Sequence, residues 1–136
     1  MADVAVTLRW TGEGLRFDGG ARDGAWIRLD GDGETGPAPM QTLLLALAGC
    51  MAADVVNILG KMRLPLEGLE FRIEGDRAPE PPRRYLRLRM VCETRGIAAA
   101  DEDKVRRALA LSEEKYCSVL HTLRPDLDIG TRLILS

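Results

Sequence analysis

The feature that most constrains this chain is an uncharged, apolar segment that runs from Gln41 to Ala53. It lies inside a longer stretch, residues 38–63, whose composition predicts one continuous helix with Cys50 near its middle. A helix that is apolar on all faces must be buried in a large core, in a partner subunit or in a membrane. Polar residues interrupt the stretch from Asp54 onward, which disfavours a membrane span. We therefore expect this helix at the centre of a protein that does not enter a membrane.

Length and charge exclude several classes of protein. A chain of 136 residues predicts one domain, residues 1–136. A net charge of −2 favours neither nucleic acid nor an anionic membrane as a partner. The three cysteines are widely spaced, without a C-x-x-C motif, and there is one histidine, so we expect no metal site and no disulfide framework. The first residues do not show the basic segment followed by an apolar one that is typical of a secretory signal. This beginning and the cysteine usage favour the cytoplasm.

The remaining sequence predicts strands on both sides of the central helix, because apolar and polar residues alternate there. Strands in adjacent runs indicate the α+β class with a largely antiparallel sheet. The expected elements are N-terminal strands within residues 3–30, the central helix over 38–63, strands within 68–95, a second, cysteine-bearing helix over 101–123 and a last strand over 127–135.

Cysteine is the residue type that offers chemistry here, since no Ser-His-Asp set, phosphate loop or nucleotide motif is present. Cys92 falls on the apolar face of a strand, where a cysteine is usually an inert small hydrophobe. Asp54 lies one helical turn after Cys50 and by itself opposes ionisation of that thiol. Arg22, in a glycine-rich loop, is a candidate cation that the fold could bring to Cys50. Spacing alone leaves open whether Cys50 is a core residue or a nucleophile.

Two separated motifs resemble signatures of the OsmC/Ohr family. They are GPAPMQTLLLALAGC over residues 36–50 and SEEKYCSVLHTL over residues 112–123. With the predicted order of strands and helices, the resemblance covers nearly the whole chain. It implies an α+β fold and an intertwined homodimer, with the two central helices buried at its centre and two active sites at the subunit interface.

The resemblance also implies a reaction, the thiol-dependent reduction of organic hydroperoxides in defence against oxidative stress. By position, Cys50 corresponds to the peroxidatic thiolate, which becomes a sulfenic acid. Cys117 corresponds to the resolving cysteine, and an external thiol or dithiol then reduces the resulting disulfide. Arg22 resembles the family arginine that stabilises the thiolate and polarises the peroxide. No cofactor or metal is implied.

One position departs from the peroxidase pattern. Peroxidases of the family carry a glutamate directly after the proline that opens the central helix, and that glutamate pairs with the arginine. This chain has Met40 there, followed by the neutral Gln41, and neither side chain replaces a carboxylate that binds a guanidinium. Met40, Gln41 and Asp54 are thus the candidates for supporting roles.

The same departure keeps two other functions open. The chain is most similar to a less-characterised OsmC-like branch with the pattern PM-x-x-LLLALAGC. A protein of this branch could bind a hydrophobic ligand in an interface pocket, or act as a thiol redox sensor without turnover.

Overall fold

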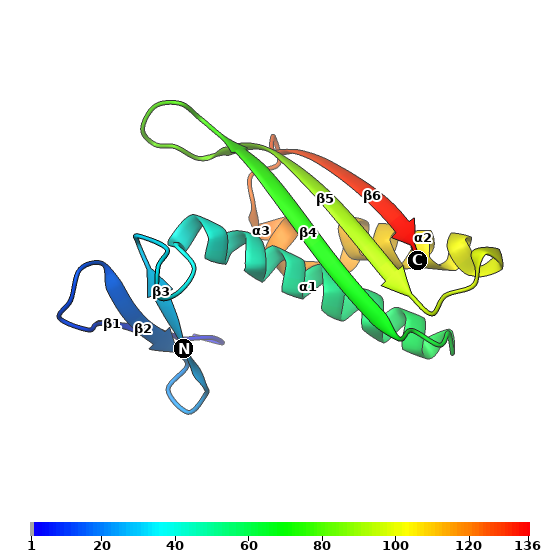
Figure 1. Cartoon of the computed structure of the whole chain (residues 1–136), viewed down its shortest axis with the longest axis horizontal. Coiled ribbons are helices and arrows are strands. Elements are labelled where there is room, and N and C mark those ends of the chain that lie inside the picture. Colours follow the sequence, from blue (N-terminus) through cyan, green and yellow to red (C-terminus); the bar gives the residue numbers. More distant parts are fainter. Residues whose placement is uncertain (1) are drawn as a thin grey trace. The chain divides into compact units, whose positions relative to one another are not determined.

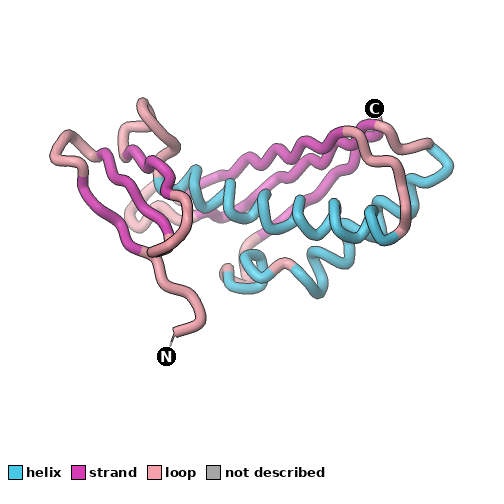
Figure 2. The backbone as a smooth tube through the Cα atoms, turned by 90° about the horizontal axis from the view of Figure 1, so that it is seen from below, coloured by secondary structure: helices cyan, strands magenta, loops and turns pink. Residues whose placement is uncertain are grey.

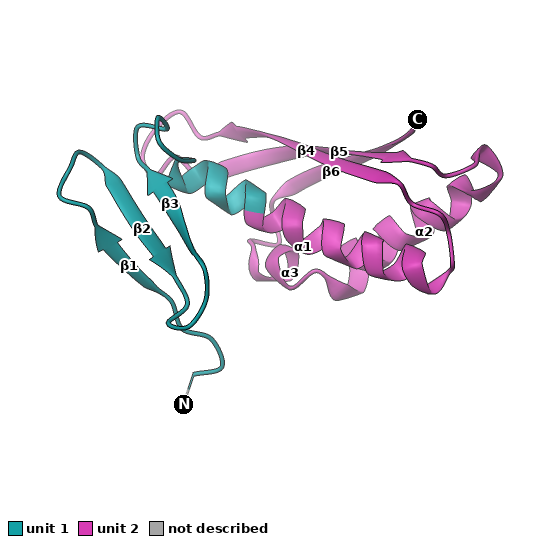
Figure 3. Cartoon of the chain, turned by 60° about the horizontal axis from the view of Figure 1, so that its bottom comes forward, with its two compact units in different colours: residues 1–45 teal, residues 46–136 magenta. Residues whose placement is uncertain are grey.

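The computed structural model describes residues 2–136, which form two compact units (Figure 3). The first unit ends at Leu45 and the second covers Ala46–Ser136. The boundary falls within α1 (Pro39–Lys61), the helix that the sequence places at residues 38–63. Mixed helices and sheets confirm the predicted α+β class.

The first unit is a three-stranded antiparallel meander. It consists of β1 (Thr7–Trp10), β2 (Arg16–Gly20) and β3 (Trp26–Asp30), which pair in the order of the chain (Figure 1). Two-residue alternation along β1 places Leu8 and Trp10 on one face, and both are exposed.

Asp30 ties the end of this sheet to the loop that leads into α1. Its buried carboxylate accepts hydrogen bonds from the backbone N–H groups of Asp32 and Thr35, both 2.9 Å long, and from the Thr35 hydroxyl. These bonds hold the pKa of Asp30 at about 2, below its usual value, because they stabilise the charged form. The Asp30 N–H in turn donates to the Pro37 carbonyl, so the chain enters α1 from an ordered loop.

The second unit is built on a three-stranded sheet with helices against one face (Figure 2). Strands β4 (Gly68–Arg77) and β5 (Tyr85–Arg95) form an antiparallel hairpin. Strand β6 (Asp128–Leu135) pairs with β5 in parallel, whereas the other strand pairs are antiparallel, as a largely antiparallel sheet requires. The parallel direction follows from the helical connection between β5 and β6, which carries the chain back along the sheet.

The core of this unit lies between α1, α2 (Glu102–Leu111) and the sheet. From α1, Val55 and Leu59 pack in a cluster of buried side chains that α2, β5 and β6 complete. The other members are Cys92, Ile97, Val105, Ala108, Leu109 and Leu133. The four fully buried residues of α1 recur every four positions, at Leu47, Met51, Val55 and Leu59, so one face of this helix carries the contact.

Part of α1 stays uncovered within the chain. Leu45 is 60% exposed and Val56 is 48% exposed. By length and composition α1 could also cross a membrane, a property that it shares with core helices of soluble proteins. The predicted burial of this helix on all sides is therefore incomplete in a single chain, because the sheet and α2 reach only one of its faces.

The second predicted helix, residues 101–123, is broken in the structure. A 3-10 turn at Ala99–Asp101 leads into α2, one π-helical turn follows at Ser112–Tyr116, and α3 covers Ser118–Thr122. Cys117 lies between the last two, with an extended backbone (φ −72°, ψ 100°). It is thus not within a continuous helix as expected, because the π turn ends the regular helical hydrogen bonding just before it.

Two leucines of β5 test this account of the core. Leu88 is 1% exposed and Leu86 is 39% exposed. Replacing buried Leu88 by alanine leaves a cavity and should lower the free energy of unfolding by about 2–5 kcal/mol. Leu86→Ala, the control on the same strand, should cost less than half as much. Urea denaturation measures both, and equal losses would contradict the assignment of Leu88 to the core.

Candidate functional site

Cys50 and Cys117 meet within the second unit, although 67 positions separate them in the sequence. Cys50 comes from α1 and Cys117 from the break before α3, and the two side chains lie close enough for Cys50 to raise the pKa of the Cys117 thiol. Both are free thiols. Cys50 is partly exposed, whereas Cys117 is fully buried. The structure thus brings together the two cysteines that the sequence motifs single out.

The π turn is what places Cys117 beside α1. The Cys117 N–H donates to the Ser112 carbonyl at 2.9 Å, a bond that spans five residues instead of the four of an α-helix. Single π turns inside helices are frequent at functional sites. After the turn, the Cys117 sulfur accepts the Leu120 N–H at 3.4 Å, so the Cys117 side chain caps the start of α3.

Asp54 and Ser112 form a second contact between α1 and the same turn. The Ser112 hydroxyl donates to the Asp54 carboxylate at 2.8 Å. Asp54 follows Cys50 by one helical turn, so the two side chains share a face of α1. Ser112 is fully buried. One residue, Ser112, therefore holds Cys117 through its carbonyl and Asp54 through its hydroxyl.

The surroundings of Cys117 keep its thiol protonated. The pKa of Cys117 is raised to about 11, and burial is the largest cause. The nearby Cys50 and the negative charge of Asp54 also act to raise it, whereas the Leu120 N–H opposes them by stabilising a thiolate. At neutral pH Cys117 is thus a thiol, and it must lose a proton before or while it forms a bond.

Cys92 takes no part in this site. It lies on β5 inside the buried cluster, and burial raises its pKa to about 11. The sequence-based interpretation of Cys92 as a core residue is consistent with this position.

The other predicted site residues belong to the first unit. Arg22 lies in the loop between β2 and β3, and its side chain is exposed. Met40 is half-buried in the first turn of α1. The Gln41 side-chain oxygen accepts the Ala38 N–H at 2.8 Å, so Gln41 caps the N-terminus of the helix.

Sequence reasoning missed Ser112. The spacing of Ser112 and Cys117 carries no recognisable pattern, since a regular helix would direct the two residues to different neighbours. A π turn before the cysteine could not be predicted from periodicity.

Among residues 2–136, no group of three or more His, Cys, Asp or Glu side chains could hold a metal ion.

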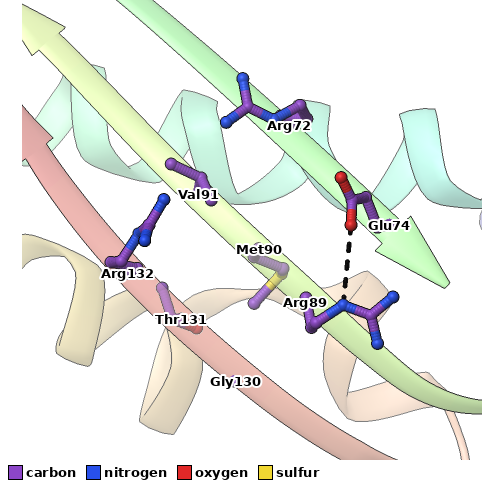
Figure 4. Close-up of a pocket in the computed structure, with 8 residues that line it drawn as sticks. All are labelled: Arg72, Glu74, Arg89, Met90, Val91, Gly130, Thr131 and Arg132. Atoms are coloured by element: carbon purple, nitrogen blue, oxygen red, sulfur yellow. Dashed lines mark ion pairs between the residues drawn. The ribbon is translucent and has the colours of Figure 1, made fainter.

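The second unit also carries a groove of about 400 Å³ on the outer face of its sheet (Figure 4). Three arginines line it, at positions 72, 89 and 132, and Glu74 pairs with Arg89 at 3.6 Å. None of the three cysteines lines this groove.

A smaller groove of about 290 Å³ lies on the first unit and has the opposite character. Apolar side chains and glycines dominate its walls, with Leu8, Ile27 and Leu29 among them. It is a surface on which apolar groups from another molecule could be buried.

Comparisons with known proteins agree with the motifs. The family described as OsmC-like protein matches residues 31–132. Protein YhfA of Escherichia coli K12 is 37% identical over 127 residues, which is 93% of each chain. A hypothetical protein from Aquifex aeolicus has a TM-score of 0.86 at 26% identity, over 100% of this chain and 98% of its own.

A hydroperoxide-resistance protein is also among the structural neighbours. It is OhrB of Bacillus subtilis, with a TM-score of 0.62 over 95% of this chain and 96% of its own. At 18% identity this likeness shows the fold alone.

The burial of the three thiols predicts an order of alkylation. At pH 7 iodoacetamide should modify Cys50 first, because Cys50 is partly exposed whereas Cys92 and Cys117 are buried. Both buried thiols have a pKa of about 11, so their thiolate fraction at pH 7 is only about 10⁻⁴ and increases until pH 11. Peptide mass spectrometry after timed labelling measures the three rates. If Cys117 were labelled as fast as Cys50, the burial of the Cys117 thiol would be contradicted.

Proposed function

Because the chain belongs to the OsmC family, we propose that it is a thiol-dependent peroxidase that reduces organic hydroperoxides with Cys50 and Cys117. The observation that carries the proposal is the contact between these two thiols. One thiol is accessible to a substrate, and the second is held against it, as a two-cysteine mechanism requires.

The reaction proceeds in three steps. The Cys50 thiolate attacks the terminal oxygen of the hydroperoxide, the O–O bond breaks, and an alcohol leaves after protonation. The resulting Cys50 sulfenic acid condenses with the Cys117 thiol, which forms a disulfide and releases water. An external thiol or dithiol then reduces the disulfide by exchange. The protein itself needs no cofactor or metal, and it works in the cytoplasm, where such reductants are maintained.

Arg22 supplies the positive charge in this proposal. A guanidinium near Cys50 favours the thiolate and polarises the peroxide oxygen. Met40 leaves that arginine without the carboxylate partner of the peroxidase branch, so we expect a lower peroxidase rate than a glutamate at this position would support.

We further propose that the protein is a homodimer. Along α1 the residues Gly49, Ala53, Val56 and Gly60 recur at intervals of four, three and four, and all are exposed. A side-chain carbon at Gly49 or Gly60 would meet nothing within 4 Å. Small residues in such a row let a second helix approach closely. A second copy of α1 on this face would give the helix the burial that its composition demands.

The first unit supplies further apolar surface for a second copy. On β1, Leu8 is 54% exposed and Trp10 is 62% exposed, and Val6, which precedes the strand, is 75% exposed. Neighbouring exposed apolar side chains of this kind suit an interaction surface.

The apolar groove of the first unit favours a second candidate function, the binding of a hydrophobic ligand. In that case a ligand would copurify with the protein, and Cys50→Ser would not affect its binding. A third candidate, a thiol redox sensor, uses the same cysteine pair without turnover.

Treatment with cumene hydroperoxide tests the peroxidase. The wild-type chain should form an internal Cys50–Cys117 disulfide and keep one free thiol, and it should turn over when a dithiol is supplied. Cys50→Ser should abolish turnover. Cys117→Ser should stop at a sulfenic acid that dimedone traps. Mass spectrometry that counts the free thiols distinguishes the reduced, disulfide and sulfenic acid forms. Three free thiols after peroxide would refute the proposal, and one oxidation without turnover would identify a sensor.

Met40→Glu tests the role given to Arg22. The new carboxylate can accept bonds from the guanidinium and hold it toward the thiolate, so kcat/KM for cumene hydroperoxide should rise by about tenfold, the equivalent of 1.4 kcal/mol. Met40→Gln is the matched control of nearly equal size, and it should stay within about twofold of the wild type. An equal change in both variants would show that size, not charge, matters at this position.

A further inference from the structure

The resolving step of the proposed reaction has an unmet requirement, which is the removal of a proton from Cys117. The thiol is fully buried, and its pKa of about 11 keeps it protonated. A buried thiol exchanges protons slowly with solvent unless a neighbouring group accepts them. The resolving step therefore needs a proton acceptor close to Cys117.

Asp54 is the carboxylate whose charge acts on the Cys117 thiol. It lies one turn after Cys50 on α1. Within the second unit, Cys50 and Asp54 are the titratable groups whose charge reaches Cys117, from the α1 side. From its own segment, the Cys117 sulfur accepts the Leu120 N–H at 3.4 Å, a group that carries no titratable proton.

Ser112 orients this carboxylate. Its hydroxyl donates to one oxygen of Asp54, Oδ2, at 2.8 Å, which leaves the other oxygen, Oδ1, available. The Ser112 carbonyl holds the Cys117 N–H at 2.9 Å. The same buried residue thus fixes both the donor and the acceptor of the proton.

We propose that Asp54 is the proton acceptor for the Cys117 thiol during disulfide formation, and that Ser112 is the positioning residue that aligns the two. The sulfur of Cys117 forms a bond to the sulfur of Cys50, and the S–O bond of the sulfenic acid breaks. The thiol proton passes to Asp54 and from there to the departing hydroxide, which leaves as water. This role rests on the proposed function of Cys117 as the resolving cysteine.

An assay without peroxide isolates the step. Ellman's reagent, a disulfide that releases the coloured thiolate TNB, should react first at Cys50 and release one TNB. Cys117 then attacks the Cys50–TNB disulfide, loses its proton and releases a second TNB. Excess reagent is removed rapidly after the first release, so the second release of TNB is a single-turnover reaction. Its rate is measured by absorbance from pH 6.5 to 9.5. A Cys117→Ser chain, which must release only one equivalent, provides the baseline.

Asp54→Asn should slow the second release by about a hundredfold or more at pH 7, which is the lower end of typical general-base effects. The rate of this variant should increase about tenfold per pH unit as hydroxide replaces the carboxylate, while the wild-type rate changes less. Ser112→Ala should give a smaller loss, because Asp54 remains but is no longer held. The matched controls Glu114→Gln and Ser118→Ala change exposed residues next to Cys117 and should leave the rate unchanged.

Three results would overturn the inference. The first is a second-release rate of Asp54→Asn that equals that of the wild type. The second is a rate of Asp54→Asn that is lower than the wild-type rate by the same factor at every pH, which indicates a purely structural role. The third is a wild-type chain that releases only one TNB. Because no peroxide is present, a normal result here with no turnover of cumene hydroperoxide would reject the proposed peroxidase and leave the role of Asp54 standing.

Discussion

The packing of one face of α1 against the sheet and α2 is the contact on which the rest of this molecule depends. Val55 and Leu59 enter the buried cluster, and this fixes the rotation of the helix about its axis. Because 3.6 residues complete a turn, the rotation also decides where Cys50 and Asp54 point. They flank the buried row and face the turn that follows α2. The apolar contacts thus position a polar site without taking part in it.

The break after α2 completes that site. A continuous helix from residue 101 to 123 would carry Cys117 on a regular helical path. Instead, one π turn inserts an extra residue, the Cys117 N–H bonds to the Ser112 carbonyl, and the chain becomes extended at the cysteine. The Ser112 hydroxyl bonds to Asp54 across the helix interface. This hydrogen bond joins the two elements beside the cysteine pair, where a loss of register would separate the thiols.

Periodicity predicted the central helix because a long uncharged run has few alternatives to burial, and α1 ends within two residues of the expected bounds at each end. The same reasoning predicted the strands flanking it. It predicted a largely antiparallel sheet but not which strand pair is parallel, because direction depends on the path of the connection and not on the alternation within the strand. It also read one helix where there are separate helical segments, since the π turn keeps an apolar pattern that resembles a helix.

Cys50, Asp54 and Cys117 were identified from motifs and helical spacing, whereas Ser112 was not. The sequence by itself determined the long apolar helix, the α+β class, the family and the two cysteines of the proposed site, since these follow from composition, local periodicity and short motifs. Only the tertiary structure decided that the two thiols meet, that Cys117 is buried as a thiol, and that Ser112 joins it to Asp54. Such contacts connect residues more than fifty positions apart, and their geometry depends on how helices pack, which no local pattern encodes.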